Sequence, residues 1–306
     1  MEILRNANIN FVGGMRVAFF ISVLLIAAGI VSLIAHGGPH LSIDFTGGTM
    51  LQVTIDPRPD VGEIRSALEA GGFMGVQVQE FGENGFLITF PTVQEEGEAY
   101  AVDAMHDALE AGFPAANVVT EREESVGPKI GGELRTAAMN SVALALVLIV
   151  LYITVRFIFR YGIAAILALV HDVTITLGVF SLLDKEISLT IIAAFMTIIG
   201  YSLNDTIVVF DRIRENMRLR RKESYRQVIN RSINECLSRT VLTSTTTFFV
   251  AGALYVLGGA VIHDFAFALC FGVIIGTYSS IFIASPILVW WTERRIIDRK
   301  RAAPSM

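Results

Sequence analysis

An asparagine and an aspartate lie side by side inside a long apolar run of the sequence. The run begins near Leu189, and Asn204 and Asp205 precede its charged end at Asp211 and Arg212. A carboxyl group inside a membrane segment costs about 2.5–3.5 kcal/mol to insert, so it usually faces a protein interior or water and marks an ion or proton pathway. We interpret Asp205 as a group that binds and releases a proton. The alternative is a carboxylate held by hydrogen bonds between packed helices.

Arg239 opens a later apolar run, and threonines follow it at helical spacing. At 1.5 Å per residue, Asp205 lies about 9 Å inside the membrane edge that Asp211 marks, and Arg239 lies at a similar depth. We expect Arg239 to be a switchable partner of Asp205. Alternatively, it is an interfacial anchor whose side chain snorkels outward.

A second ionisable pair, His171 and Asp172, lies in the middle of another apolar run. Histidine titrates in the physiological range, so this pair is either a proton relay or a structural hydrogen-bonded pair. Two carboxylates on separate runs also suggest an intramembrane aspartyl protease. However, the local sequences VHDV and SLND lack the YD and GxGD motifs of such proteases, and we rank that interpretation last.

Composition places these groups in a membrane protein. Of the 306 residues, 53% are hydrophobic and 17% are charged, below the roughly 25% charged residues of soluble domains, and the mean hydropathy is +0.58. The first apolar run is too long for a signal peptide and has no clear cleavage site, so we expect an uncleaved anchor. Because each run approaches the roughly 20 residues that span a bilayer, we predict six transmembrane helices at about 15–35, 136–155, 161–183, 188–210, 240–260 and 265–291.

Basic residues predict the orientation of these helices. They cluster between the fourth and fifth runs, in the C-terminal tail, at the N-terminus and in the short second-to-third turn, which the positive-inside rule assigns to the cytoplasm. Both termini are therefore expected in the cytoplasm, and we read these charges as topology signals, with no nucleic-acid binding. The basic residues on the cytoplasmic side are Arg5, Arg16, Arg156, Arg160, Arg212, Arg214, Arg218, Arg220, Arg221, Lys222, Arg226, Arg231, Arg239, Arg294, Arg295, Arg299, Lys300 and Arg301; those on the opposite side are Arg58, Arg65, Arg122, Lys129 and Lys185.

The segment 36–134 is long enough to fold outside the membrane. Alternating β-branched runs predict strands, and apolar residues at helical spacing predict two helices. The order is β-α-β-β-α-β, the ferredoxin-like or split βαβ pattern, with elements at 49–55, 60–72, 76–81, 85–90, 95–112 and 115–122. We therefore expect four regions: an N-terminus with the first helix (1–35), an α+β external domain (36–134), five further helices (135–291) and a basic tail (292–306).

Two glycine-bearing motifs frame the external domain: LSIDFTGGT (41–49) and ESVGPKIGGEL (124–134). Glycine adopts backbone angles that other residues resist, so the motifs are either plain turns at the membrane boundary or hinges of a moving domain. In the last run, small residues recur every fourth position, a pattern that lets helices approach closely. The motif residues are Asp44, Phe45, Gly47, Gly48, Gly127 and Pro128; the small-residue stripe is Gly272, Gly276, Ser280 and Ala284.

The external domain contains no constellation of catalytic residues. Its histidines, His36, His40 and His106, lack ligand-like spacing to another histidine or to a cysteine, so we expect no metal, no cofactor and no enzymatic activity. The only cysteines, Cys236 and Cys270, lie outside this domain, which therefore uses no disulfide.

The motifs, taken in order, resemble those of the SecF family. They are DFTGG after the first predicted helix, VGPKIGGEL before the second, HDV in the third, GYSLNDTIVVFDRIREN across the fourth and LSRTVLTSTTT at the fifth. SecF is the smaller subunit of the SecD–SecF complex of bacterial protein export and is related in fold to transporters of the RND superfamily. The resemblance covers roughly residues 5–295.

The resemblance implies a multi-pass subunit of the bacterial inner membrane, an RND-like half that needs SecD to complete twelve spans. It implies use of the proton-motive force to assist translocation of unfolded preproteins through SecYEG, with Asp205 and Arg239 in the proton pathway. It also implies that the DFTGG and VGP motifs form the base of a moving external domain. The alternative is half of an RND-type exporter of small molecules, for which an external domain of this size gives little room.

Overall fold

The computed structural model describes residues 7–81, 84–90, 98–220 and 222–292. The predicted basic tail, 292–306, therefore lies almost wholly outside the described residues. Two compact units are present, and each is described by itself. The helical unit holds residues up to His40 and the spans Val142–Lys185 and Thr190 onward, and the external unit holds Leu41–Ser141 and Glu186–Leu189.

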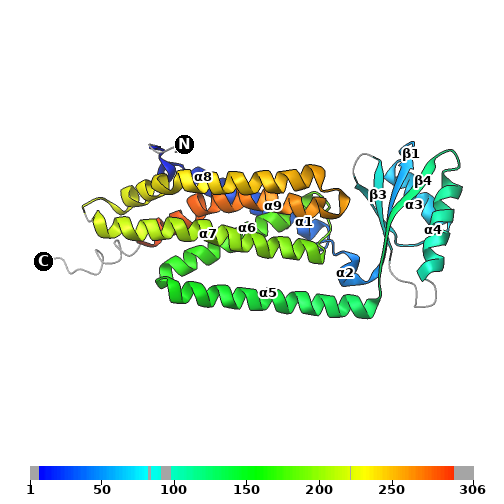
Figure 1. The fold of residues 1–306 in the computed structure, drawn as a ribbon, viewed down its shortest axis with the longest axis horizontal. Coiled ribbons are helices and arrows are strands. Elements are labelled where there is room, and N and C mark those ends of the chain that lie inside the picture. Colours follow the sequence, from blue (N-terminus) through cyan, green and yellow to red (C-terminus); the bar gives the residue numbers. More distant parts are fainter. Residues whose placement is uncertain (1–6, 82–83, 91–97, 221, 293–306) are drawn as a thin grey trace. The chain divides into compact units, whose positions relative to one another are not determined.

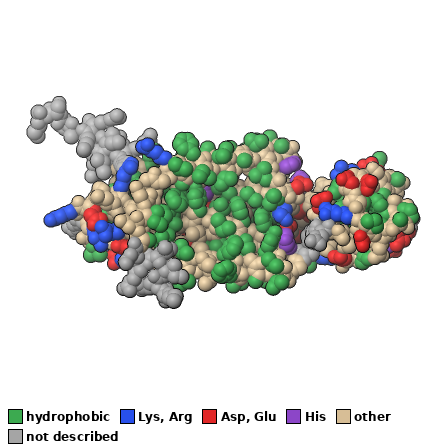
Figure 2. Space-filling view, turned by 90° about the horizontal axis from the view of Figure 1, so that it is seen from above, with side chains coloured by type: hydrophobic (Ala, Val, Ile, Leu, Met, Phe, Trp, Pro, Cys, Tyr) green, Lys and Arg blue, Asp and Glu red, His purple; other side chains and the backbone are tan. Residues whose placement is uncertain are grey.

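Six helices in the described residues are long and apolar enough to cross a membrane. The helix that begins at Ala260 continues through one π-helical turn, Ser280–Ala284, so that this last span reaches Thr292. Figure 2 shows hydrophobic side chains over most of the visible face of the helical unit, with charged side chains near its ends. A polytopic α-helical membrane protein is therefore the correct fold class. The helices are α1 (Phe11–Ala35), α5 (Pro128–Arg156), α6 (Phe159–Leu182), α7 (Leu189–Leu219), α8 (Tyr225–Leu257) and α9 (Ala260–Ser279).

The interior of the helical unit is formed mainly by α6, α7 and the last span. In each of these helices about half of the residues in the most apolar segment are buried. By contrast, only 11% of the residues in the most apolar segments of α5 and α8 are buried. These two helices present apolar side chains outward, as helices facing lipid do. Close approach is made by small residues. Added Cβ atoms on Gly29 of α1 and Gly178 of α6 would each lie 2.7 Å from the other glycine's Cα.

Helices α7 and α8 are longer than the sequence predicted. We expected spans ending at 210 and starting at 240, but α7 reaches Leu219 and α8 begins at Tyr225. The extensions are amphipathic and hold each other: Arg212 donates to Glu235 at 2.6 Å, and buried Asn216 donates to Glu235 at 2.7 Å and to Ser232 at 3.0 Å. Because these polar groups satisfy each other, both helices continue beyond their apolar segments.

The external unit contains a four-stranded antiparallel sheet in the order β2-β3-β1-β4. Helices α3 and α4 cover one face (Figure 1), where Val53, Ile64 and Leu109 are fully buried in the domain's own core. The predicted β-α-β-β-α-β order is present; the ferredoxin-like designation remains an interpretation of it. A short helix within the DFTGG motif, α2, was not predicted. The elements are α2 (Ile43–Thr46), β1 (Gly48–Asp56), α3 (Val61–Ala70), β2 (Gln77–Phe81), β3 (Gly85–Phe90), α4 (Glu98–Gly112) and β4 (Asn117–Val126).

Candidate functional site

The Asp205 side chain is buried between α7 and α8, with an exposed fraction of 3%. Ser244 and Arg239, both on α8, are the polar side chains near enough to act on it. Its Oδ2 atom is buried and makes no hydrogen bond to any described residue. A buried carboxylate oxygen without a donor is costly when charged. Asp205 is therefore a group whose environment does not fully satisfy its ionised form.

Arg239 lies well inside α8 and is exposed on the surface of the chain. Among the described residues, no ion pair within 4.0 Å joins it to Asp205. Its influence on Asp205 is thus through charge at longer range. The predicted switchable pairing is not formed in this structure and stays a prediction.

Asn204 points away from Asp205, toward the outside of the bundle. It belongs to an exposed stripe on α7 with Ala193, Thr197 and Gly200, whose spacing of four, three and four residues places them on one helix face. A Cβ atom added to Gly200 would meet nothing within 4 Å. The stripe is small and partly polar, which is typical of a surface that contacts another transmembrane helix. The polar residues of α7 are thus divided between this exposed stripe and the buried Asp205.

The His171–Asp172 pair lies at the centre of a buried network. Asp172 is 1% exposed, and its Oδ2 accepts hydrogen bonds from Ser202 of α7 at 2.5 Å and Ser279 of α9 at 2.7 Å. Its Oδ1 lies 2.8 Å from His171 Nδ1. Nε2 of His171 lies 2.9 Å from Ser22 Oγ of α1. The network therefore joins α1, α6, α7 and α9.

Donor counting fixes where the protons of this network lie. The single hydroxyl proton of Tyr278 is donated to the Ala18 carbonyl at 2.6 Å, so Ser22, 3.0 Å from Tyr278 Oη, must donate to it. Ser22 then has no proton left for His171, and Nε2 of His171 must be the donor to Ser22. One further proton lies between Nδ1 and Asp172. The pair therefore carries no net charge, and its polar atoms have partners.

Ser244 links the Asp205 region to α9 through a chain of hydroxyl groups. Tyr201 donates to Ser244 at 3.1 Å, and Ser244 lies 2.6 Å from Thr277 Oγ1. Since Thr277 donates its own proton to the Val273 carbonyl at 2.8 Å, Ser244 must be the donor to Thr277. A serine hydroxyl has one proton, so Ser244 can donate either to Thr277 or to Asp205, but not to both.

The small-residue stripe of α9 lies against α7. A Cβ atom on Gly272 would lie 2.4 Å from Ile198, and one on Gly276 would lie 3.1 Å from Ser202 Cβ. Ser280 is fully buried. These positions bring Ser202 and Ser279 to Asp172, so the packing serves the network.

The glycine motifs meet within the external unit. Gly47 and Gly48 have φ angles of +69° and +136°, which favour glycine. An added Cβ atom on Gly47 would lie 2.9 Å from the Cα of Pro128, the first residue of α5, and one on Gly48 would lie 2.5 Å from the Phe90 carbonyl oxygen. Phe45 is buried beside them in the sequence, whereas Gly127 has open space around it. The two motifs are in backbone contact; whether they act as hinges stays a prediction.

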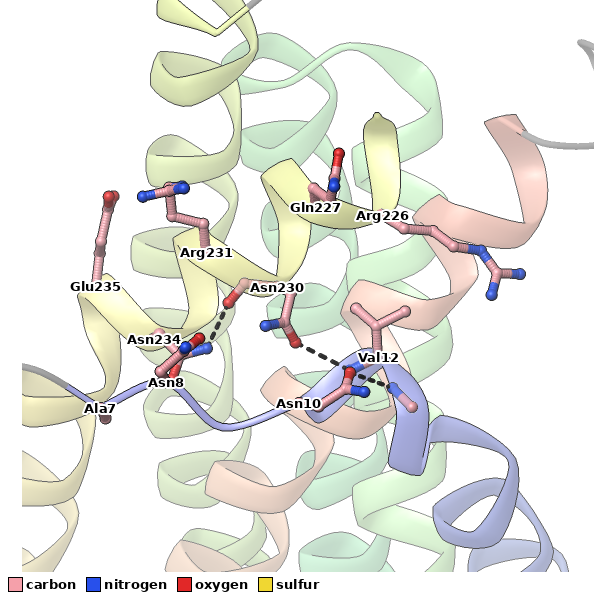
Figure 3. A pocket seen from close by; sticks show the side chains of 11 residues that line it. Ala7, Asn8, Asn10, Val12, Arg226, Gln227, Asn230, Arg231, Asn234 and Glu235 are labelled. Atoms are coloured by element: carbon pink, nitrogen blue, oxygen red, sulfur yellow. Dashed lines mark hydrogen bonds between the residues drawn. The ribbon is translucent and has the colours of Figure 1, made fainter. Parts of the chain in front are cut away.

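Two other features carry less chemistry. A polar cavity of about 700 Å³ lies between the chain before α1 and the start of α8 (Figure 3). There, Asn230 accepts from the Val12 amide at 3.2 Å and Asn234 from the Ile9 amide at 2.9 Å, which fixes the approach to α1. On α4, His106, Asp107 and Glu110 come close together on the surface, as exposed acidic groups on a helix commonly do.

Sequence reasoning found the ionisable groups but not their partners. Ser22, Tyr278 and Ser279 are separate residues inside apolar runs, with no motif that marks them, and Ser202 lies in the GYSLND segment, where only Asn204 and Asp205 were singled out. Ser244 lies in the threonine-rich LTSTTT segment, where helical spacing placed polar residues on α8. Contacts between helices that are distant in sequence are what make these residues functional candidates.

The sequence of this chain is similar to that of known membrane proteins of protein export. Residues 106–294 match the family model for the C-terminal region of the protein export membrane proteins SecD/SecF, and residues 32–57 match the SecD/SecF GG motif. The chain is 43% identical to the protein translocase subunit SecF of Gemmatimonas aurantiaca, covering 95% of this chain and 89% of that one. It is 46% identical to SecF of Desulfurispirillum indicum, covering 91% and 90%.

A solved structure gives the same result. The crystal structure of SecDF, a translocon-associated membrane protein from Thermus thermophilus, is similar with a TM-score of 0.84 at 41% identity, covering 95% of this chain and 40% of that chain. These matches define a membrane subunit of the protein-export machinery. The chain therefore belongs to the SecD/SecF family of protein export membrane proteins, in which it corresponds over nearly its whole length to SecF. The names of these relatives are those of translocase subunits and indicate no catalytic activity.

Proposed function

We propose that this chain works with SecD to use the proton-motive force in preprotein translocation through SecYEG, and that Asp205 is the group that binds and releases the proton. The observation that carries this proposal is the Asp205 carboxylate, which is buried inside an apolar helix with one oxygen unpaired. Such a group gains a hydrogen-bond donor only by taking up a proton or by meeting a new partner. Both events change its interaction with Ser244.

The partner is expected on the exposed stripe of α7. SecDF of Thermus thermophilus contains both halves in one chain, and this chain matches only 39% of it, which supports SecD as the partner. Asn204 and Gly200 on α7, and Arg239 on α8, are polar or small groups that lie outside the bundle. Arg239 and Asn204 would be poorly solvated by lipid, so a second helical half with polar groups at this face would stabilise them.

Proton binding at Asp205 has a direct structural consequence through Ser244. In this structure Ser244 donates its proton to Thr277, and an ionised Asp205 would compete for that proton. When Asp205 is protonated, the Ser244 proton is available for Thr277 of α9, 2.6 Å away. The hydrogen bonds among α7, α8 and α9 thus depend on the protonation of one carboxyl group, as a proton-driven machine requires.

The His171–Asp172 pair is proposed to support this site. Its partners are already satisfied within the chain, and its network passes through Ser202 and Ser279, which the α9 small-residue stripe positions. This favours a scaffold that fixes α6 and α9 against α7. In the relay interpretation, the proton between His171 and Asp172 would instead be exchanged during each cycle.

The proposal places both termini in the bacterial cytoplasm and the external unit on the opposite side of the inner membrane. The basic residues at and beside the α7–α8 connection, Arg218, Arg220, Lys222 and Arg226, support this orientation, because they lie next to the membrane spans. The external unit would then face the translocating preprotein.

The test is proton flux into vesicles that contain this chain with and without SecD, together with export of a preprotein in cells that lack their own SecD and SecF. Asp205→Asn is expected to lower both by at least about tenfold, while co-purification with SecD is unchanged. Asp172→Asn, the matched change at the satisfied carboxylate, is expected to leave flux within about twofold of the wild type. Full flux and export in Asp205→Asn would overturn the proposal.

A further inference from the structure

The first turn of α7 is capped by a residue from the DFTGG motif. The Leu189 amide donates to Oδ2 of Asp44 at 2.9 Å, and both residues belong to the external unit. The first amides of a helix lack partners within the helix, and a carboxylate at this end also interacts favourably with the helix dipole. The cap of α7 therefore includes a side chain that is distant in sequence and belongs to α2.

Backbone contacts reinforce this attachment. The Ser42 amide donates to the Ile187 carbonyl at 3.0 Å, and Leu41 and Ile187 form a parallel bridge. The Ser42 side chain also caps α2 by accepting from the Asp44 amide at 3.3 Å. The start of α7 and the short helix α2 are thus joined by backbone and side-chain hydrogen bonds within one unit.

The same short helix contacts the base of the sheet and the start of α5. Gly47 follows α2 and approaches Pro128 so closely that no side chain would fit, and an added Cβ atom on Gly131 would lie 3.0 Å from the Gly47 amide nitrogen. Gly48 then begins β1. Three elements, β1, α5 and α7, therefore meet at α2, and Asp44 is the side chain by which α2 holds α7.

We propose that Asp44 is a positioning residue that fastens the first turn of α7 to the base of the external unit, so that movement of α7 during the proton cycle is passed to β1 and α5. The inference rests on the proposed function of Asp205, which lies on the same continuous helix about 24 Å from Leu189 at 1.5 Å per residue. Because α7 is unbroken from Leu189 to Leu219, a shift at Asp205 reaches its first turn without an intervening loop.

The structural part is tested by hydrogen exchange on the full chain in lipid nanodiscs. Asp44→Ala is expected to speed exchange in the first turn of α7 about fivefold, which corresponds to the roughly 1 kcal/mol that an N-cap contributes. Asp44→Asn keeps a capping oxygen and should restore protection. Asp60→Ala is the matched control: Asp60 caps α3 in the same unit by accepting from the Gly62 amide at 2.7 Å, so only α3 should exchange faster. Unchanged exchange in Asp44→Ala overturns the inference.

The functional part is tested with SecD co-expressed, by measuring proton flux and preprotein export in the same preparations. Asp44→Ala is expected to lower export about tenfold while proton flux stays within about twofold, since only the coupling is lost. Asp44→Asn and Asp60→Ala should resemble the wild type. Normal export in Asp44→Ala, or an equal loss of flux and export that Asp60→Ala shares, overturns the inference. If Asp205→Asn retains full flux, the proposed function fails instead, while the exchange result still reports on the cap.

Discussion

Within the described part of the chain, two carboxylates on neighbouring helices, Asp172 of α6 and Asp205 of α7, are buried in opposite hydrogen-bonding environments. Asp172 accepts hydrogen bonds from two serines and lies next to His171, whereas one oxygen of Asp205 has no hydrogen-bond partner among the described residues. Both are almost fully buried. Burial alone therefore does not indicate which carboxylate works in a proton cycle; the count of satisfied atoms separates them.

The packing around the two carboxylates differs as well: Asp172 is enclosed by this chain, whereas Asp205 lies beside an exposed helix face. Around Asp172 the residues are small and closely packed, and its side-chain partners come from α6, α7 and α9. Asp205 instead lies next to the exposed stripe of α7, which includes Asn204 and Gly200. A satisfied polar network specifies one arrangement of helices. The Asp205 carboxylate, which lacks a full set of hydrogen bonds and lies next to the exposed stripe of α7, is suited to change its partners.

The largest expected effect on stability is at the satisfied site. Asp172→Ala removes the acceptor for Ser202 and Ser279 and leaves His171 without its counter-ion, so we expect a loss of about 3–5 kcal/mol, as for other broken buried pairs. The free energy of unfolding in mixed micelles measures it. Asp205→Ala is the matched change and should cost less, because it removes a group that already lacks one partner.

A double variant sharpens this result. Asp172→Leu combined with His171→Leu replaces both members by apolar side chains, which is often neutral or stabilising for a buried ion pair. If this variant folds and exports preprotein normally with SecD, the pair is a scaffold. If it folds but proton flux is lost, the pair is a relay, and the proposed division between the two carboxylates is wrong.

The sequence predicts the ionisable groups well because their cost in an apolar run is visible in one dimension. Asp205, Arg239, His171 and Asp172 are each recognisable as exceptions within long apolar segments. The six spans follow from the same hydropathy, and the strand and helix order of the external unit follows from residue periodicity. These features depend on local pattern alone.

What the sequence cannot provide is pairing across distance. Ser22 and Ser279 are ordinary serines until α1 and α9 bring them to His171 and Asp172, and Asp44 is one acidic residue among many until α2 places it at the start of α7. The extensions of α7 and α8 were missed for the same reason, since Asn216 and Glu235 satisfy each other only after the hairpin forms. Each contact requires the tertiary arrangement.

The next largest expected effect is on SecD binding by the exposed stripe of α7, which contains Gly200. A Cβ atom added at Gly200 would meet nothing within 4 Å and the position is exposed, so Gly200→Leu should change the stability of the isolated chain by less than about 1 kcal/mol. Its affinity for SecD should fall about tenfold or more, because a bulky residue prevents close helix approach. Co-purification with tagged SecD at graded detergent and protein concentrations measures the affinity.

Gly272→Leu is the control for this variant. Its added side chain would collide with Ile198, 2.4 Å from the first added carbon, and should destabilise the chain itself by about 1–3 kcal/mol. Undiminished SecD binding by Gly200→Leu would place the partner on another surface of the helical unit. The contrast between the side of α7 that packs on α9 and the exposed stripe that binds SecD would then no longer hold.

The smallest expected effect is at Ser244, whose hydroxyl group connects the Asp205 region to α9. Ser244→Ala removes the acceptor for Tyr201 and the donor to Thr277, which should cost about 1 kcal/mol of stability and, under the proposed function, lower proton flux with SecD severalfold. Ser244→Thr keeps the hydroxyl and should restore flux. The matched change in the closed network is Ser202→Ala, which removes one of two hydroxyl donors to Asp172 and should affect stability without affecting flux. Equal flux in the wild type and Ser244→Ala would mean that the hydroxyl chain from Tyr201 to Thr277 only holds the helices together, as the Asp172 network does.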